Sequence, residues 1–220
     1  MDNVVSKPWG YEYIAYHNED VALKVLHIAK EERTSLHCHP NKSTGLVLLS
    51  GTAEINFIAD SKILKSPAKQ MIRRGLFHQT RAISDNGCIM FEIETPVDKD
   101  DLVRLKDNYG RQNRGYEGSQ HELPRYENCL HLVEPNINDF TEYRFFGRKL
   151  YLTWANNFNI FDDKPEDEIV MFLKGGITKT IEGRTHLVTQ PGDVGQIKVV
   201  KQVASEMDGF SENTLVLFII

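Results

Sequence analysis

Three histidines in the first half of the chain have the residue type and spacing of a transition-metal site. His37 and His39 are two residues apart in the segment Ser-Leu-His-Cys-His, which begins at Ser35. In a strand, side chains at positions i and i+2 point to the same side. Both imidazoles are therefore predicted to share one face, and Cys38 to point to the other. We expect the fold to bring His78 to this pair. Three neutral imidazoles with open positions would suit Zn, Mn, Fe, Co or Ni.

A metal of this kind polarises a carbonyl or a sugar hydroxyl. Chemistry that moves a proton between adjacent carbons beside such a metal also needs a base. Glu92, Glu94 and His37 are the candidate bases. The two glutamates are also candidates for a carboxylate ligand, and we expect only one of them to face the interior.

Recognition of a phosphate favours arginine and lysine, which make charge-assisted contacts. The candidates are Arg73, Arg74, Arg104 and Arg111. Arg73 and Arg74 are adjacent on a predicted strand, so one of them is expected to point outward. Asp101 lies three residues before Arg104, a spacing that also fits an ordinary helical ion pair.

The segments that must position these residues have the patterns of β-strands. Apolar or alternating runs recur along the chain, separated by glycine and proline, which predicts an all-β barrel or sandwich. Ser50 and Gly51 fit a hairpin turn. Residues 98–107 instead predict one or two helical turns, with Asp98 as the N-cap. Strands are predicted again at 149–154, 168–176, 177–183, 195–200 and 215–220.

The two halves of the chain share a pattern, in which an apolar strand runs into a glycine turn and a further strand. Seven residues before that glycine stand Thr44 in the first half and Glu168 in the second. The second half has no His-x-His, which predicts a duplicated barrel whose second copy has lost its metal site. The terminal strand, 215–220, must pair with something. Closure of the second barrel is the simplest partner, and a homodimer interface is the alternative.

Composition narrows the classes of protein further. The chain has 220 residues, 40% hydrophobic and 26% charged, with a formal net charge of −5. This balance argues against a nucleic-acid footprint or an anionic membrane surface. No apolar run approaches the roughly 18–20 residues of a membrane span, and the N-terminus has no signal-peptide pattern. Three cysteines without metal-ligand spacing predict reduced thiols and a cytoplasmic location.

The histidine segments resemble the two motifs of the cupin superfamily. His37-Cys38-His39 with Gly51 is similar to the first motif, and Gly75-Leu-Phe-His78 to the core of the second. The resemblance implies tandem cupin jelly-roll β-barrels, the second of them degenerate. The expected boundaries are 1–97 for the metal-binding barrel, 98–148 for a connecting segment and 149–220 for the second barrel.

Within cupins, residues 4–112 resemble the C-terminal isomerase domain of type II phosphomannose isomerases, the bifunctional mannose-1-phosphate guanylyltransferases. Three segments carry this likeness: Lys7-Pro-Trp-Gly-Tyr-Glu12, residues 35–54, and residues 100–111 with Asp101, Arg104, Asp107, Tyr109, Gly110 and Arg111. The resemblance implies that His39 and His78 are metal ligands and that Arg104 and Arg111 belong to the active site. His37 is a ligand in the general cupin pattern only. Where the pattern has a glutamate ligand, this chain has Thr44.

The resemblance implies a metal-dependent aldose–ketose isomerase or epimerase. Its substrate would be a sugar phosphate or nucleotide sugar, in bacterial surface-carbohydrate synthesis. One alternative is a non-catalytic, sugar-binding cupin, and a weaker one is an iron-dependent dioxygenase. The identity of the metal discriminates between them, because oxygen chemistry needs Fe(II) or a similar redox metal, whereas an isomerase tolerates Zn.

Overall fold

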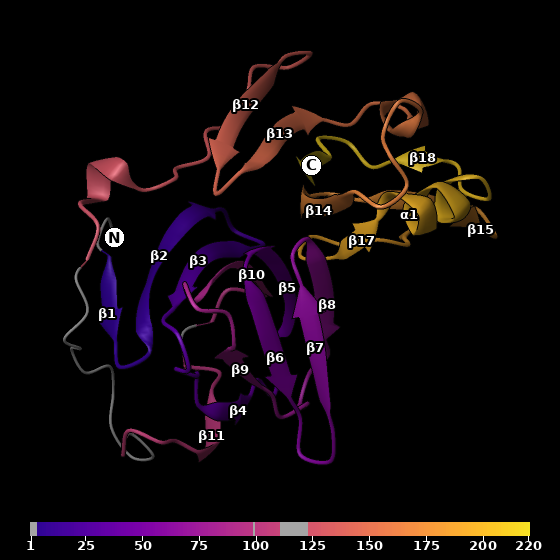
Figure 1. Cartoon of the computed structure of the whole chain (residues 1–220). Coiled ribbons are helices and arrows are strands. Elements are labelled where there is room, and N and C mark those ends of the chain that lie inside the picture. Colours follow the sequence, from indigo (N-terminus) through magenta and orange to yellow (C-terminus); the bar gives the residue numbers. More distant parts are fainter. Residues whose placement is uncertain (1–3, 99, 111–122) are drawn as a thin grey trace. The chain divides into compact units, whose positions relative to one another are not determined.

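The chain folds into two compact units, residues 1–131 and 132–220, each built from antiparallel strands. The structure is a computed structural model, which describes residues 4–98, 100–110 and 123–220. Figure 1 shows the layered strands of both units. The prediction of an all-β protein is confirmed. Among the described residues, no helix is long and apolar enough to cross a membrane.

The first unit is a two-layer barrel with a small additional sheet. Its larger layer has the order β1 (Val5–Lys7), β2 (Gly10–His17), β3 (Ala22–Ile28), β10 (Cys88–Thr95), β5 (Ser43–Ser50), β8 (Ala68–Ile72). The second layer is β7 (Ser61–Lys65), β6 (Thr52–Asn56), β9 (Gln79–Ala82). The additional sheet pairs β4 (Leu36–Cys38) with β11 (Val103–Lys106).

The two layers of the first unit enclose one apolar core. Leu26, Leu48 and Met90 reach it from the larger layer, and Ala53 and Ile55 from the smaller one; all five are at most 3% exposed. Inward and outward residues alternate along β6, as expected for a strand with one buried face. Trp9 also packs into this core.

Gly51 is a corner between the two layers and not a hairpin turn. β5 pairs with β10 and β8, whereas β6, which begins at Thr52, pairs with β7 and β9. The predicted hairpin is therefore wrong. Gly51 has φ +86°, and a side chain there would meet the backbone of Gly87, so glycine lets the chain cross from one layer to the other.

The second unit has a five-stranded layer and a three-stranded layer. The first has the order β12 (Phe140–Phe145), β13 (Arg148–Trp154), β19 (Leu215–Ile219), β14 (Ile169–Lys174), β17 (Val194–Gln196). The second is β16 (Arg184–Leu187), β15 (Ile177–Ile181), β18 (Gly209–Phe210). The short helices are η1 (Tyr126–Asn128) in the first unit, and η2 (Phe158–Phe161) and α1 (Ile197–Ala204) in the second.

The second unit repeats the strand order of the first. The order β12-β13-β19-β14-β17 has the connectivity of β2-β3-β10-β5-β8, and β16-β15-β18 has that of β7-β6-β9. The chain also changes layer after β14 at Gly175, as it does at Gly51. Where the first unit has β4, with its histidines, the second has η2. This topology supports duplication with loss of the histidine strand; the expected boundaries at 97 and 148 stay a prediction.

Two predicted elements are corrected by the structure. The strand expected at 195–200 ends at Gln196, and helix α1 begins at the next residue, Ile197. Ile197, Val200 and Ala204 are the buried residues of α1, and their spacing is helical over two turns, which a six-residue window does not reveal. The helical turns expected at 98–107 are also wrong, because residues 103–106 are strand β11. The terminal strand pairs within its own unit, since β19 lies between β13 and β14.

Gly10 determines how closely β2 approaches β3. Its φ is +145°, and a Cβ atom there would lie 2.0 Å from the carbonyl oxygen of His27. We therefore expect Gly10→Ala to lower the free energy of unfolding by about 2–4 kcal/mol, measured by urea denaturation. Gly209→Ala is the control, because nothing lies within 4 Å of its Cβ position and it has no positive φ. Equal stability of the two variants would contradict the prediction.

Candidate metal centre

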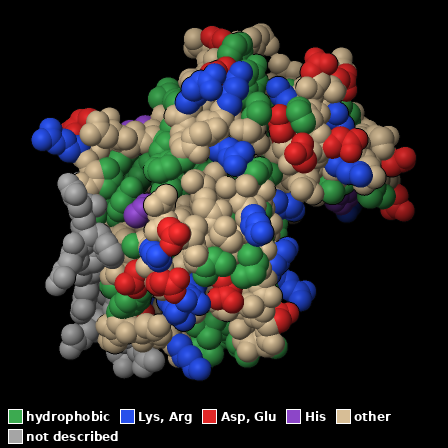
Figure 2. Space-filling view, viewed as in Figure 1, with side chains coloured by type: hydrophobic (Ala, Val, Ile, Leu, Met, Phe, Trp, Pro, Cys, Tyr) green, Lys and Arg blue, Asp and Glu red, His purple; other side chains and the backbone are tan. Residues whose placement is uncertain are grey.

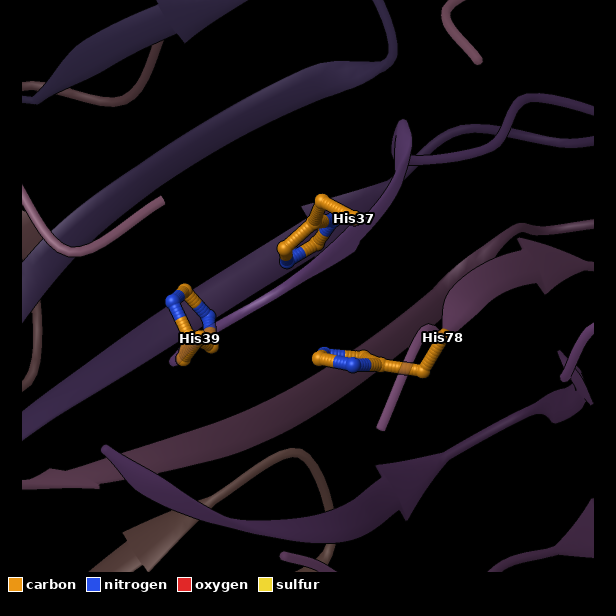
Figure 3. A group of neighbouring side chains, drawn as sticks. All are labelled: His37, His39 and His78. Atoms are coloured by element: carbon orange, nitrogen blue, oxygen red, sulfur yellow. The ribbon is translucent and has the colours of Figure 1, made fainter. Parts of the chain in front are cut away.

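The three predicted histidines come together in the first unit, as Figure 3 shows. His37 lies on β4, His39 follows the end of that strand, and His78 immediately precedes β9. His37 and His78 are directly opposite each other, and each backbone N–H donates to the other's carbonyl at 3.0 and 2.8 Å. One ring nitrogen from each histidine lies within 4.8 Å of the others. The i, i+2 spacing and one antiparallel bridge thus build the triad.

Each of the three imidazoles has its Nδ1 atom next to a backbone carbonyl. The distances are 2.8 Å from His37 to Ser35 O, 2.6 Å from His39 to Asp101 O, and 3.0 Å from His78 to Leu76 O. A carbonyl accepts only, so Nδ1 carries the proton in each ring and Nε2 keeps its lone pair. Carbonyl partners of this kind orient metal-binding histidines and fix their tautomer.

The electrostatics of the triad suit a metal ion. Desolvation lowers the pKa of all three imidazoles, that of His78 to about 4, so the rings stay neutral at pH 7. Neutral imidazole is the form that binds metal. His39 and His78 are buried, and their Nε2 atoms have no hydrogen-bond partner among the described residues. Buried polar atoms of native proteins are usually satisfied, so the residues fit a divalent transition metal.

Asp101 holds the loop that follows the His-x-His segment. Its carboxylate accepts hydrogen bonds from the backbone N–H groups of Asn41 and Lys42 and from the Asn41 amide, at 2.9–3.1 Å. These bonds, to which Asn41 contributes most, lower the pKa of Asp101 although burial alone would raise it. Because the backbone carbonyl of the same residue accepts from His39, Asp101 positions both the loop and the imidazole.

Replacing Asp101 by alanine is expected to loosen His39 without removing a histidine. We expect Asp101→Ala to weaken Co²⁺ or Zn²⁺ affinity by about 10–100-fold, the usual cost of losing a group that orients a ligand. Competition with a chromophoric chelator measures this effect. Asp100→Ala is the matched control, since Asp100 is the exposed neighbour. The same metal affinity in both variants would show that the Asp101 side chain does not affect metal binding by the triad.

His37 and His39 open onto a cavity of about 340 Å³ in the first unit. Residues from β1, β2, β3 and the turn between β1 and β2 form an apolar wall, with Trp9, Tyr13 and Leu26 as its largest members. Leu102 and Arg104 line the cavity from β11 and the residue before it. The volume is in the range of small-molecule sites, which combine apolar walls with a few placed polar groups.

A network of buried charges occupies the cavity wall beside the histidines. Lys24 Nζ lies 2.9 Å from Glu94 Oε2 and 3.9 Å from Glu92 Oε2, and Lys42 Nζ lies 3.2 Å from Glu94 Oε1. Burial would raise the pKa of Glu94, but Lys24 and Lys42 hold it below its ordinary value. Burial and the neighbouring Glu94 raise the pKa of Glu92 to about 7. The two carboxylates therefore differ in their readiness to accept a proton.

The structure places the predicted site residues as follows. Glu92 and Glu94 both line the cavity, so the expectation that only one faces inward is wrong; residues two apart in a strand share a face. Arg104 lines the cavity and stands opposite His37 in the β4–β11 ladder, so it lies on a strand and not on the predicted helical turn. Arg73 and Arg74 are both exposed and outside the cavity lining. Arg111 lies outside the described residues.

Four charged cavity residues did not enter the sequence prediction: Lys7, Glu12, Lys24 and Lys42. Lys7 on β1 is 2% exposed, and its Nζ atom lies 3.1 Å from Oε1 of Glu12 on β2. Both belong to the Lys-Pro-Trp-Gly-Tyr-Glu segment, which carries part of the family resemblance and could have indicated them as site residues. Lys24 is the lysine of a mainly apolar strand, and Lys42 follows the histidine pair closely. Elsewhere, acidic and basic side chains are interspersed on the face seen in Figure 2.

The fold and the triad define the first unit as a cupin-type barrel with a candidate histidine metal site. Residues 1–107 match the family model described as "Mannose-6-phosphate isomerase C-terminal". This match covers the histidines, both glutamates and Arg104. A search of curated proteins found no match.

Several solved structures are similar to part of this chain. The protein KdgF from Halomonas sp. is 13% identical with a TM-score of 0.42; the match covers 44% of this chain and 91% of that one. The capsular polysaccharide assembling protein CapF from Staphylococcus aureus is 15% identical with a TM-score of 0.44, covering 48% of this chain and 34% of that one. A cupin-2 domain protein from Shewanella frigidimarina is 18% identical with a TM-score of 0.34, covering 38% and 78%.

Proposed function

We propose that the first barrel is a metal-dependent isomerase of a sugar phosphate, with mannose 6-phosphate as the first substrate to test. The observation that carries this proposal is the triad, whose three Nδ1 atoms face backbone carbonyls and whose Nε2 atoms are free to bind a metal beside a cavity. The family match over residues 1–107 supports the choice of reaction. A role in bacterial surface-carbohydrate synthesis stays a prediction of the resemblance.

His37, His39 and His78 would hold the divalent metal. When bound, the metal would polarise the carbonyl and hydroxyl oxygens of the sugar. Glu92 is the proposed base, which removes a proton from one carbon and returns it to the neighbouring carbon. Its raised pKa and its place on the cavity wall, 3.9 Å from Lys24 Nζ, support this role over that of Glu94, whose carboxylate is paired with two lysines.

The charge of the cavity supports an anionic substrate. Four basic side chains, from Lys7, Lys24, Lys42 and Arg104, line it together with three glutamates. Arg104 is the proposed phosphate contact, because a guanidinium binds phosphate through two parallel hydrogen bonds. The apolar wall of Trp9 and Leu26 would exclude water from the face of the sugar.

The test is an isomerisation assay on the full chain. The protein is stripped with a chelator, reloaded separately with Zn²⁺, Mn²⁺, Fe²⁺, Co²⁺ and Ni²⁺, and incubated with mannose 6-phosphate while ketose phosphate is measured. We expect turnover in a loaded form and none in the stripped form. Thermal stabilisation by sugar phosphates without turnover in any loaded form would overturn the enzyme and favour the sugar-binding alternative. Oxygen consumption confined to the Fe²⁺ form would favour a dioxygenase.

A further inference from the structure

Position 44 has no carboxylate, although it faces the interior of the barrel beside the candidate metal site. Thr44 lies on β5 and is 1% exposed. Its Oγ1 atom is buried and has no hydrogen-bond partner among the described residues. A buried hydroxyl in this state is uncommon. The family pattern described above has a glutamate ligand at this position. With Thr44 in its place, strand β5 supplies no carboxylate to the site.

Glu94 stands directly across the sheet from Thr44. The two residues are partners in the antiparallel β5–β10 ladder. Residues opposite each other in such a ladder have Cβ atoms about 4.5–5.5 Å apart and project to the same face. A carboxylate at position 94 therefore enters much the same space as one at position 44 would. Its Oε1 atom lies 3.7 Å from His39 Nε2.

The contact between Glu94 and His39 brings two acceptors face to face. His39 Nδ1 lies 2.6 Å from the carbonyl oxygen of Asp101, so its proton is there and Nε2 presents a lone pair. Glu94 presents a carboxylate oxygen. Two buried lone pairs at this separation repel each other, and the Lys42 ammonium, which lies 3.2 Å from the same oxygen, offsets only part of that repulsion because it is not placed between them by any contact with His39 Nε2. The distance of 3.7 Å is one that two ligands of a single ion, each about 2.0–2.2 Å from it, readily adopt.

Lys24 and Lys42 fix the Glu94 carboxylate without using all of its acceptor capacity. Lys24 binds Oε2 at 2.9 Å, and Lys42 lies 3.2 Å from Oε1. An ionised carboxylate offers about four lone-pair sites, so Oε1 retains one on the side of His39. The lysines also make a carboxylate necessary, because a divalent ion beside two buried ammonium groups would otherwise be repelled.

We propose that Glu94 is the carboxylate ligand of the metal held by the histidine triad, supplied from β10 in place of the residue at position 44. This inference rests on the metal site of the proposed function. Glu92 provides an internal comparison, because it shares the strand, the cavity face and the neighbour Lys24 with Glu94. Glu94 contacts a histidine of the triad, His39, and this contact is the difference that the test exploits.

The experiment measures Co²⁺ binding to the full chain by chelator competition, together with the visible absorption spectrum of the bound ion, which reports its ligand set. We expect Glu94→Gln to weaken Co²⁺ binding by about 100-fold and to change the spectrum. Glu92→Gln, the matched control, should change the affinity less than about threefold and leave the spectrum intact. An affinity loss in Glu94→Gln with an unchanged spectrum would overturn the proposal, since Glu94 would then act only through its charge.

A second variant covers the case in which Glu94→Gln folds poorly. Glu94→Gln combined with Thr44→Glu returns a carboxylate to the opposite strand, and we expect it to regain at least about tenfold in Co²⁺ affinity. Thermal unfolding of every variant reports whether it is folded. No regain in a folded double variant would count against the proposal. If the unaltered protein binds no Co²⁺, the proposed function itself fails. If the unaltered protein and Glu94→Gln bind Co²⁺ equally well, only the role of Glu94 as a ligand fails.

Discussion

Replacing His39 or His78 by alanine is expected to remove the metal from the protein. Each substitution deletes one of three imidazoles whose ring nitrogens lie within 4.8 Å of one another. Two remaining imidazoles hold a divalent ion far more weakly than three, because each ligand contributes to a shared coordination shell. Elemental mass spectrometry should find about one transition metal per chain in the unaltered protein and less than about 0.1 in either variant.

The control for this prediction is His186→Ala. His186 is exposed on β16 of the second unit, and its loss should leave the metal content unchanged. Reduced metal in this control would mean that the ion binds nonspecifically. Full metal content in both His39→Ala and His78→Ala, after dialysis against a weak chelator, would refute the triad as the binding site.

The second large effect is expected from Glu92→Gln. Glutamine keeps the size and the hydrogen-bonding reach of the side chain but cannot accept a proton from carbon. Removal of a general base typically costs about 10²–10⁴-fold in turnover. We expect a loss of this size in kcat for sugar-phosphate isomerisation, with the metal content unchanged.

Glu54→Gln is the comparison for the Glu92 variant. Glu54 lies on β6, on the smaller layer, and does not line the cavity onto which His37 and His39 open. Its substitution should leave kcat within about twofold of the unaltered protein. An isomerase whose kcat survives Glu92→Gln would need its base elsewhere, and Glu94 and His37 are the remaining candidates among those proposed from the sequence.

The predicted triad shows how much local spacing can establish. His37 and His39 are two residues apart, and strand geometry alone puts both on one face. The arrival of His78 is a tertiary contact, predicted through resemblance to a family rather than through spacing. The same limit explains Arg73 and Arg74. They were candidates because arginine makes charge-assisted contacts with phosphate, but both are exposed in the segment before His78.

Two of the errors in the prediction have the same cause. In each, the structure of a segment depends on which distant strand it pairs with. The step at Gly51 has the local signature of a hairpin, and only the pairing of β5 and β6 with different strands shows that it is a corner. Residues 103–106 are a strand because β4 offers them an edge, a long-range pairing that outweighs the helical propensity of the segment. Both errors concern contacts between residues far apart in the chain.

The all-β class, the repeated pattern of the two halves and the histidine pair can be predicted from the residues alone, because they depend on periodicities of a few residues. The pairing of His78 with His37 and the position of Glu94 opposite Thr44 are visible only in the folded chain. The same is true of the cavity that three lysines and one arginine share with three glutamates. These facts depend on the register between strands, which is set by the packing of the whole core and is not encoded in any single segment.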